Sequence, residues 1–313
     1  MAERQNILSG GAAIAGRSKR YVVWFWLLNL ALASIGGTTF SLHAHALLDH
    51  SLYADGLVHG FDLGVLFEML GRPEFGPVRA STGPAMMLAV LFFVLTMTFL
   101  PGVLQGYASD HRISRAEFFR VCGINLGRFV RLTILFAIVG GIVAGILLGI
   151  QNGLTKAADT TSHELLPFYV QLACLAVIFL IMTAMRIWFD LAETSVVLTD
   201  QRAVRKSLGS AFRQTRKNLA RLLASYVVIA IVGLVVLAAG IWLWNVIVPP
   251  ASVLGAFLIS QAILFTLLAM RFWQRATAVA FYTKSALKET VELRPVAALE
   301  ALPSPVAPQP TGM

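Results

Sequence analysis

The chain has 313 residues, of which 57% are hydrophobic and 13% charged, and its formal net charge is +9 at pH 7. A soluble globular domain carries roughly 25% charged residues. This composition, with a mean hydropathy of +0.74, therefore excludes a soluble domain and indicates a membrane protein. The positive charge does not imply a nucleic-acid partner, because anionic lipid attracts basic residues at the inner leaflet by about 1 kcal/mol each.

Six apolar runs are long enough to cross a membrane. An α-helix needs about 20 apolar residues to span a hydrocarbon core of about 30 Å. The runs cover approximately residues 21–40, 84–104, 130–150, 167–189, 222–248 and 252–272. The predicted fold is an all-α integral membrane protein with six transmembrane helices.

The basic residues predict the orientation, because Lys and Arg are retained on the cytoplasmic side during insertion. Of the 25 Lys and Arg residues, all but Arg72, Arg79 and Lys156 lie in or beside the N-terminal tail, the second and fourth loops or the C-terminal region. This partition predicts both termini in the cytoplasm. Alternatively, the first run is a signal peptide cleaved near Ala44–Ala46, which would leave five spans.

Three regions are expected along the chain. A cytoplasmic tail covers residues 1–20, and one six-span membrane domain covers residues 21–294. The residues after Arg294 are rich in Pro and Ala without periodicity. They predict a disordered cytoplasmic tail over residues 295–313.

The first loop, residues 41–83, gathers histidines and aspartates on the outer side of the membrane. It is also rich in Leu, Val and Phe, so we expect short helices lying on the outer face. His45 and Asp49 are four residues apart and would share a helix face, and His59 could join them if the chain folds back. We favour polar and capping roles for these residues; the alternative is a metal or catalytic site.

The sequence contains an internal repeat. Phe119–Gly140 aligns with Phe212–Gly233, with Phe, Arg, Asn, Leu and Arg at matching places and a shared Ala-Ile-Val-Gly ending. A shorter echo pairs AMRIW, at Ala184–Trp188, with AMRFW, at Ala269–Trp273. Together they predict hairpin repeats that run the same way through the membrane.

The two arginines of the shorter echo, Arg186 and Arg271, lie near the predicted cytoplasmic ends of their spans. Each is followed two residues later by a tryptophan, which is typical of a snorkelling cation beside an interfacial ring. We expect them to anchor the span ends, with phosphate binding as the alternative. No Asp or Glu lies well inside a predicted span, which weakens a proton-coupled transporter.

The second and fourth loops carry basic amphipathic helices. Ser114 and Glu117 have the spacing of a capping box, and Thr199 or Asp200 can cap a helix that begins near Gln201. Apolar residues at helical spacing and cations between them predict helices at the inner interface. These cations are read first as a topology signal, then as contacts to phospholipid or to an acidic partner. The expected phosphate contacts are Arg120, Arg128, Arg213, Lys217 and Arg221.

Gly141, Gly145 and Gly149 are four residues apart, so they lie on one face of the third predicted span. Small residues allow another helix to approach closely, which is how spans associate in lipid. We expect packing against a neighbouring span of the same chain; the alternative is a homodimer interface.

The segment Thr194–Leu223, which follows the span ending AMRIWFDLAE, resembles a group of poorly characterised bacterial six-span proteins. They are grouped around the glycerophosphoryl diester phosphodiesterase membrane domain. The matching residues are Ala203, Ser207 or Ser210, Asn218 and Arg221. The catalytic domain that gives the group its name has no counterpart here. The resemblance therefore implies a fold and a membrane role, but no catalytic residues.

These observations favour a non-enzymatic inner-membrane protein that engages anionic phospholipid or a membrane partner through its basic helices. The chain contains no Walker A loop, dinucleotide fingerprint, nucleophile elbow or HExxH helix, and no cofactor is indicated. One alternative is a transporter for a small or lipid-like molecule, with a cavity lined by Asn29, Gln171 or Gln261. Another is a metal-dependent enzyme that uses the outer loop.

Overall fold

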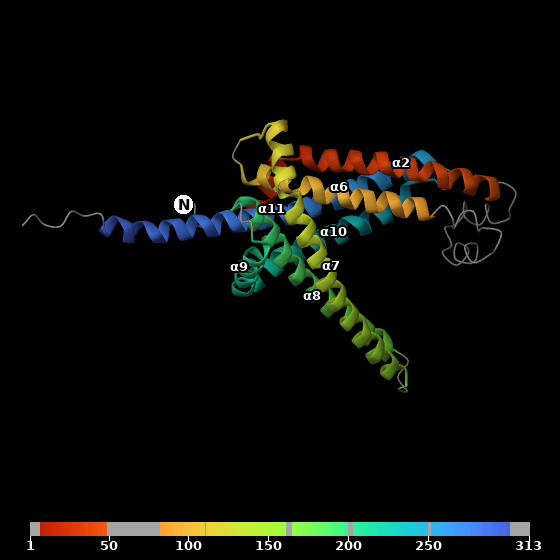
Figure 1. The fold of residues 1–313 in the computed structure, drawn as a ribbon. Helices are drawn as coiled ribbons and strands as arrows, with labels where there is room; N and C mark the ends of the chain where they lie inside the picture. The colour runs from red at the N-terminus through yellow and green to blue at the C-terminus, as the bar shows by residue number, and fades with distance from the viewer. Residues whose placement is uncertain are drawn as a thin grey trace, which may run out of the picture.

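The computed structural model describes residues 7–48, 82–109, 111–160, 165–199, 203–249 and 252–300. These residues form eight helices and no strands (Figure 1). The helices are α1 (Ile7–Arg17), α2 (Arg20–Leu48), α6 (Thr82–Ala108), α7 (Arg115–Asp159), α8 (Leu166–Leu198), α9 (Val204–Lys217), α10 (Leu219–Ile247) and α11 (Val253–Glu300).

Six of the described helices, α2, α6, α7, α8, α10 and α11, are long and apolar enough to cross a membrane. Each predicted span falls within one of these helices, to within one residue. The prediction of an all-helical protein with six long apolar helices is therefore confirmed for the described residues. The first loop, residues 41–83, lies mostly outside them, and so do its expected surface helices.

Several helices extend beyond the predicted spans. α7 has 45 residues, so at about 1.5 Å per residue it is about 68 Å long, more than twice the thickness of a hydrocarbon core. Its basic first part and the span form one continuous helix. α11 continues to Glu300, so the start of the predicted disordered tail is helical; Ala297, Ala298 and Leu299 are good helix formers.

The predicted cap of α7 is present, whereas that of α9 is not. The Ser114 hydroxyl accepts a hydrogen bond from the Glu117 backbone N–H at 3.1 Å. α9 begins at Val204 rather than near Gln201, and Ala203 precedes it without a side-chain cap. α9 packs against α8, with Ser207 and Ala211 buried.

The buried core lies at one end of the spans. It draws on the starts of α2, α7 and α10, the ends of α6 and α8, and the middle of α11. Because consecutive spans run in opposite directions, these positions all lie on the same side. Fully buried side chains here are Tyr21, Leu104, Phe129, Leu191, Leu222 and Phe272.

Two glycines of α6 allow neighbouring helices to approach closely at this core. A Cβ at Gly102 would overlap the Phe118 ring of α7, and a Cβ at Gly106 would overlap the Tyr21 phenol of α2. The rings of Tyr21 and Phe118 are themselves stacked, with centroids 5.9 Å apart. α6 is thereby fixed between the start of α2 and the start of α7.

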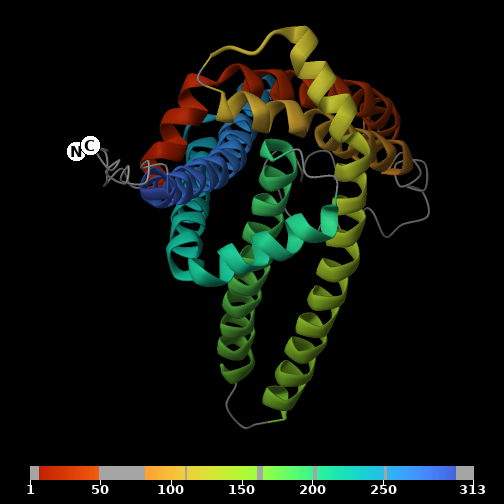
Figure 2. The same cartoon turned by 60° about the vertical axis from the view of Figure 1, so that its left-hand side comes forward.

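Away from the core the helices diverge. α7 and α8 leave together as a hairpin that points away from α2, α6 and α10 (Figures 1 and 2). The outer half of this hairpin exposes apolar side chains, such as Ile142 and Ile146 of α7 and Leu172 of α8. A surface of this kind is suited to lipid rather than water.

The glycine stripe of α7 lies on this outer half. A Cβ at Gly141, Gly145 or Gly149 would meet no described atom within 4 Å. The intramolecular packing expected at these glycines is therefore not found among the described residues. α7 and α8 do contact each other, but through positions other than these three glycines.

Two short helices are attached to the core by tryptophans. The Trp188 indole N–H of α8 donates to the Leu208 carbonyl of α9 at 3.0 Å. The Trp273 indole N–H of α11 donates to the Leu8 carbonyl of α1 at 3.1 Å. α1 therefore belongs to the folded structure, although the sequence analysis assigned residues 1–20 to a tail.

Candidate functional site

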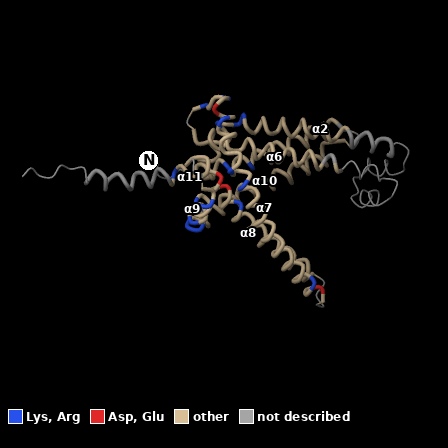
Figure 3. The backbone as a smooth tube through the Cα atoms, viewed as in Figure 1, with Lys and Arg blue, Asp and Glu red and all other residues tan. Residues whose placement is uncertain are grey.

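A cavity of about 100 Å³ lies where the hairpin meets the other spans. α6, α7, α8 and α11 all contribute to its lining. It combines five ionisable side chains with an apolar wall. The lining residues are Phe93, Met97, Thr133, Phe136, Arg186, Phe189, Asp190, Glu193, Arg271 and Arg275. Figure 3 shows that charged residues gather in this central region, whereas the long helices leaving it carry few.

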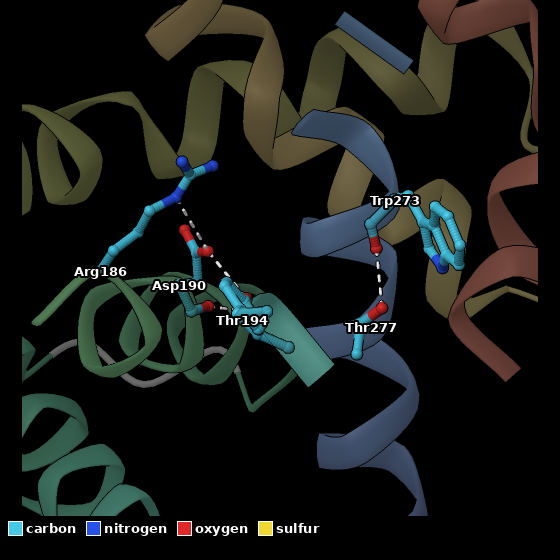
Figure 4. A network of polar contacts seen from close by, with 6 residues as sticks. Arg186, Asp190, Thr194, Trp273 and Thr277 are labelled. Carbon is cyan, nitrogen blue, oxygen red and sulfur yellow. Dashed lines mark hydrogen bonds and ion pairs between the residues drawn. The ribbon is translucent and has the colours of Figure 1, made fainter. Parts of the chain in front are cut away.

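Asp190 of α8 is the best-satisfied charge of the cavity. Its Oδ2 accepts a hydrogen bond from the Tyr226 hydroxyl of α10 at 2.8 Å. The same oxygen lies 3.7 Å from Nε of Arg186, one helical turn earlier (Figure 4). The Asp190 backbone carbonyl also accepts from the Thr194 hydroxyl at 2.7 Å. These contacts fix one carboxylate and one guanidinium group against α10.

The other carboxyl group is not satisfied in this way. Glu193 Oε2 is buried and has no hydrogen-bond partner among the described residues. The same holds for Nε of Arg275, a residue only 6% exposed. Buried polar atoms usually have a partner, whether protein, water or ligand. Two unpartnered atoms, on side chains of opposite charge, therefore belong to the lining of one small cavity.

The cavity has a positive charge excess. Three arginines, Arg186, Arg271 and Arg275, and two carboxyl groups line it. One positive charge is thus unmatched, and protonation of either carboxyl group would only enlarge the excess. Arg271 is exposed at the mouth, whereas Arg275, one turn along α11, is buried.

The opposite wall is apolar. Phe136 of α7 and Phe189 of α8 pack edge to face with centroids 4.8 Å apart. Met97 of α6 accepts a hydrogen bond from the Thr133 hydroxyl of α7 at 3.2 Å. Phe93, one turn from Met97, is exposed, so the apolar wall continues to the outer surface. The cavity is therefore charged on one side and apolar on the other.

The anchoring role expected for Arg186 and Arg271 stays a prediction, and the helices that carry them extend further than their predicted spans. Both α8 and α11 continue well past their arginines, so neither Arg186 nor Arg271 ends a helix. Arg186 pairs with Asp190 and is 22% exposed at its side chain. Trp188 and Trp273 donate to backbone carbonyls of short helices rather than forming free interfacial rings.

The cluster had a detectable signal in the sequence. Asp190 and Glu193 lie four and seven residues after Arg186, so the three share one helix face. Arg275 lies four residues after Arg271, at the place that Asp190 holds in the other copy of the echo. Sequence reasoning missed the convergence because it considered Arg186 and Arg271 only as residues near the ends of two separate spans.

The five predicted phosphate contacts do not form one site. Arg120, Arg213, Lys217 and Arg221 are exposed and make no ion pair within the described residues. Arg128 is half-buried and its Nη1 donates to the Asn125 Oδ1 at 3.1 Å. Arg213 and Lys217 lie on α9, the short helix that Figure 2 shows crossing the base of the hairpin.

The predicted metal set lies largely outside the described residues. Asp49 and His59 are not described, and His45 is described only as part of the α2 backbone. Elsewhere in the described part of the chain, no group of three or more His, Cys, Asp or Glu could hold a metal ion. The outer-loop metal site stays a prediction.

A comparison of the chain with protein families, with curated proteins and with solved structures finds no match. The resemblance of Thr194–Leu223 to the glycerophosphoryl diester phosphodiesterase membrane domain group thus rests on the sequence alone. The function must be argued from the geometry of this chain.

Proposed function

We propose that this protein is a non-enzymatic, multi-span protein of a bacterial inner membrane that engages anionic phospholipid through basic helices at the cytoplasmic interface. The observation behind the proposal is the set of exposed cations on and beside α9 that make no ion pair within the described residues. Each such cation near an anionic surface contributes about 1 kcal/mol of attraction. The resemblance noted for Thr194–Leu223 is compatible with this role.

The geometry of the spans supports the proposed orientation. The positive-inside rule assigns to the cytoplasm the same helix ends that converge in the core. α9 follows α8 and precedes α10 at these ends, and its exposed residues include Arg205, Lys206 and Arg213. Phe212 is exposed between them and its ring contacts Trp188, with centroids 5.3 Å apart. Exposed cations beside an exposed aromatic ring suit the membrane interface.

Hydrogen exchange of α9 in nanodiscs tests the proposal. Backbone amides of α9 should exchange more slowly in discs containing phosphatidylglycerol than in discs of phosphatidylcholine alone. Replacing Arg120, Arg213, Lys217 and Arg221 by Gln should remove this difference. A matched control is Lys156→Gln, an exposed cation at the far end of the hairpin. Equal exchange of wild-type α9 in both discs would contradict the proposal.

A transporter for a small or lipid-like molecule is the second candidate. Its expected lining residues Asn29, Gln171 and Gln261 do not line the charged cavity. The feature that favours it is the charged cavity itself, which opens between the hairpin and α6. Uptake or lipid-flip assays in proteoliposomes would separate movement of a ligand from binding alone.

A further inference from the structure

We propose that the charged cavity between the hairpin and α6 and α11 binds the phosphate group of an anionic amphiphile, with Arg271 and Arg275 as its ligands. This goes beyond the proposed function, because the site is a single cavity lined by α6, α7, α8 and α11 and includes none of the surface cations assigned above. The inference rests on the charge, the unpartnered atoms, the size and the two-sided lining of the cavity.

The first step is the assignment of charges inside the cavity. Tyr226 and Arg186 already engage Asp190. Arg271 and Arg275 are therefore left with Glu193 as the remaining carboxyl group of the lining. One further anion would complete the balance, and a phosphodiester carries one negative charge. Guanidinium groups suit this ligand because their planar N–H donors match phosphate oxygens.

The second step is the unpartnered Nε of Arg275. This atom is buried and lies in a residue that is 6% exposed. Leaving a buried donor of a charged group without an acceptor costs free energy. Glu193 Oε2 also has no partner among the described residues, so the Glu193 carboxylate does not satisfy the Arg275 Nε–H. A phosphate oxygen entering past Arg271 would supply the missing acceptor.

The third step is size and polarity. A cavity of about 100 Å³ is larger than the ~10–15 Å³ that one water needs, but smaller than the ~300 Å³ of a pocket for a whole drug-sized molecule. It can therefore admit a headgroup and not an entire lipid. The wall of Met97, Phe136 and Phe189 leads to the exposed Phe93, where an apolar chain can leave toward the membrane.

Ligand-dependent thermal unfolding in a neutral detergent tests the inference. The probes are short-chain phosphatidylglycerol, short-chain phosphatidylcholine and inorganic phosphate. Phosphatidylglycerol should raise the unfolding temperature of the wild type saturably. Arg271→Gln should weaken its apparent affinity about tenfold, which corresponds to about 1.4 kcal/mol. Arg271 is exposed, so this variant is expected to fold; Arg275→Gln is the second variant.

The matched control is Lys156→Gln, an exposed cation at the far end of the hairpin, which should leave the apparent affinity for phosphatidylglycerol unchanged. Arg213→Gln, on α9, tests instead the surface proposed above. Equal weakening by Arg213→Gln and Arg271→Gln would overturn the cavity and leave the surface proposal standing. If hydrogen exchange of α9 is the same in both kinds of nanodisc, and Arg271→Gln alone weakens the affinity, the surface proposal is overturned and the cavity proposal stands.

The probes also separate the sources of phosphate. Stabilisation by phosphatidylglycerol well above that by inorganic phosphate supports an amphiphile. If inorganic phosphate stabilises the protein as much as phosphatidylglycerol does, the claim that the ligand is an amphiphile is overturned, and only a phosphate site remains. Equal stabilisation by phosphatidylcholine would overturn the requirement for a net anion, and no stabilisation by any probe would overturn the site.

Discussion

Both the inner and the outer half of the α7–α8 hairpin carry large apolar side chains, yet the surroundings of these side chains are opposite. In the inner half of α7, Phe129 and Leu132 are fully buried against other helices. In the outer half, Ile142 and Ile146 are exposed and the glycines face no described atom. Hydropathy measures whether a segment can enter a membrane, and not whether protein or lipid covers it there.

The largest expected effect comes from the buried half. Phe129→Ala removes a ring that is fully enclosed, and such a change costs about 3–5 kcal/mol of unfolding free energy. Ile142→Ala, about three turns beyond Leu132 on the same helix, should cost less than about 1 kcal/mol because its side chain is exposed. Unfolding by titration with sodium dodecyl sulfate measures both. Equal losses would contradict the contrast between the two halves.

A smaller effect is expected at the polar cluster. Tyr226→Phe removes the hydroxyl that donates to Asp190, and hydrogen bonds to charged groups contribute about 1.5–3 kcal/mol. The same substitution at Tyr169, exposed at the outer end of α8, should change stability by less than about 0.5 kcal/mol. The same unfolding assay compares them. A neutral Tyr226→Phe would show that the bond does not fix Asp190.

The two tryptophan contacts predict local rather than global changes. Trp188→Phe removes the bond to α9, and Trp273→Phe removes the bond to α1; each neutral hydrogen bond contributes about 1 kcal/mol. Hydrogen exchange should accelerate about fivefold in the short helix concerned and stay unchanged in the other. Each variant is thus the control for the other. Acceleration of both helices in either variant would indicate a shared unfolding unit.

The smallest effect is expected at the glycine stripe. Gly145→Leu places a side chain where a Cβ meets no described atom within 4 Å. Stability and oligomeric state should therefore both match the wild type, as measured by unfolding and by size-exclusion chromatography with light scattering. A wild-type dimer that becomes a monomer in this variant would instead identify the stripe as an interface between copies.

The sequence predicted the positions of the long helices well, because a run of about 20 apolar residues is a strong signal. It did not predict which ends would converge. The burial of Tyr21, Leu104 and Phe272 depends on packing between segments far apart in the chain, and no local pattern encodes it. The attachment of α1 by Trp273 was missed for the same reason, since Leu8 is 265 residues away.

The charged cavity was harder to predict than the helices that form it. Arg186 and Arg271 were noticed as an echo, but each was interpreted within its own span. Asp190 and Glu193 follow the predicted end of the fourth span at residue 189, and no role was predicted for them. In the structure α8 continues to Leu198 and its final turns are buried. A helix that continues beyond its apolar run and carries charges of both signs on one face is the sequence signal of such a cluster.

Native mass spectrometry of the protein released from nanodiscs of mixed phosphatidylcholine and phosphatidylglycerol tests the central claim most directly. We predict that the wild type retains phosphatidylglycerol in preference to phosphatidylcholine and that Arg271→Gln loses this preference, while Lys156→Gln keeps it. Retention of both lipids without preference, or a protein that emerges bare under conditions gentle enough to keep other lipid contacts, would contradict the account.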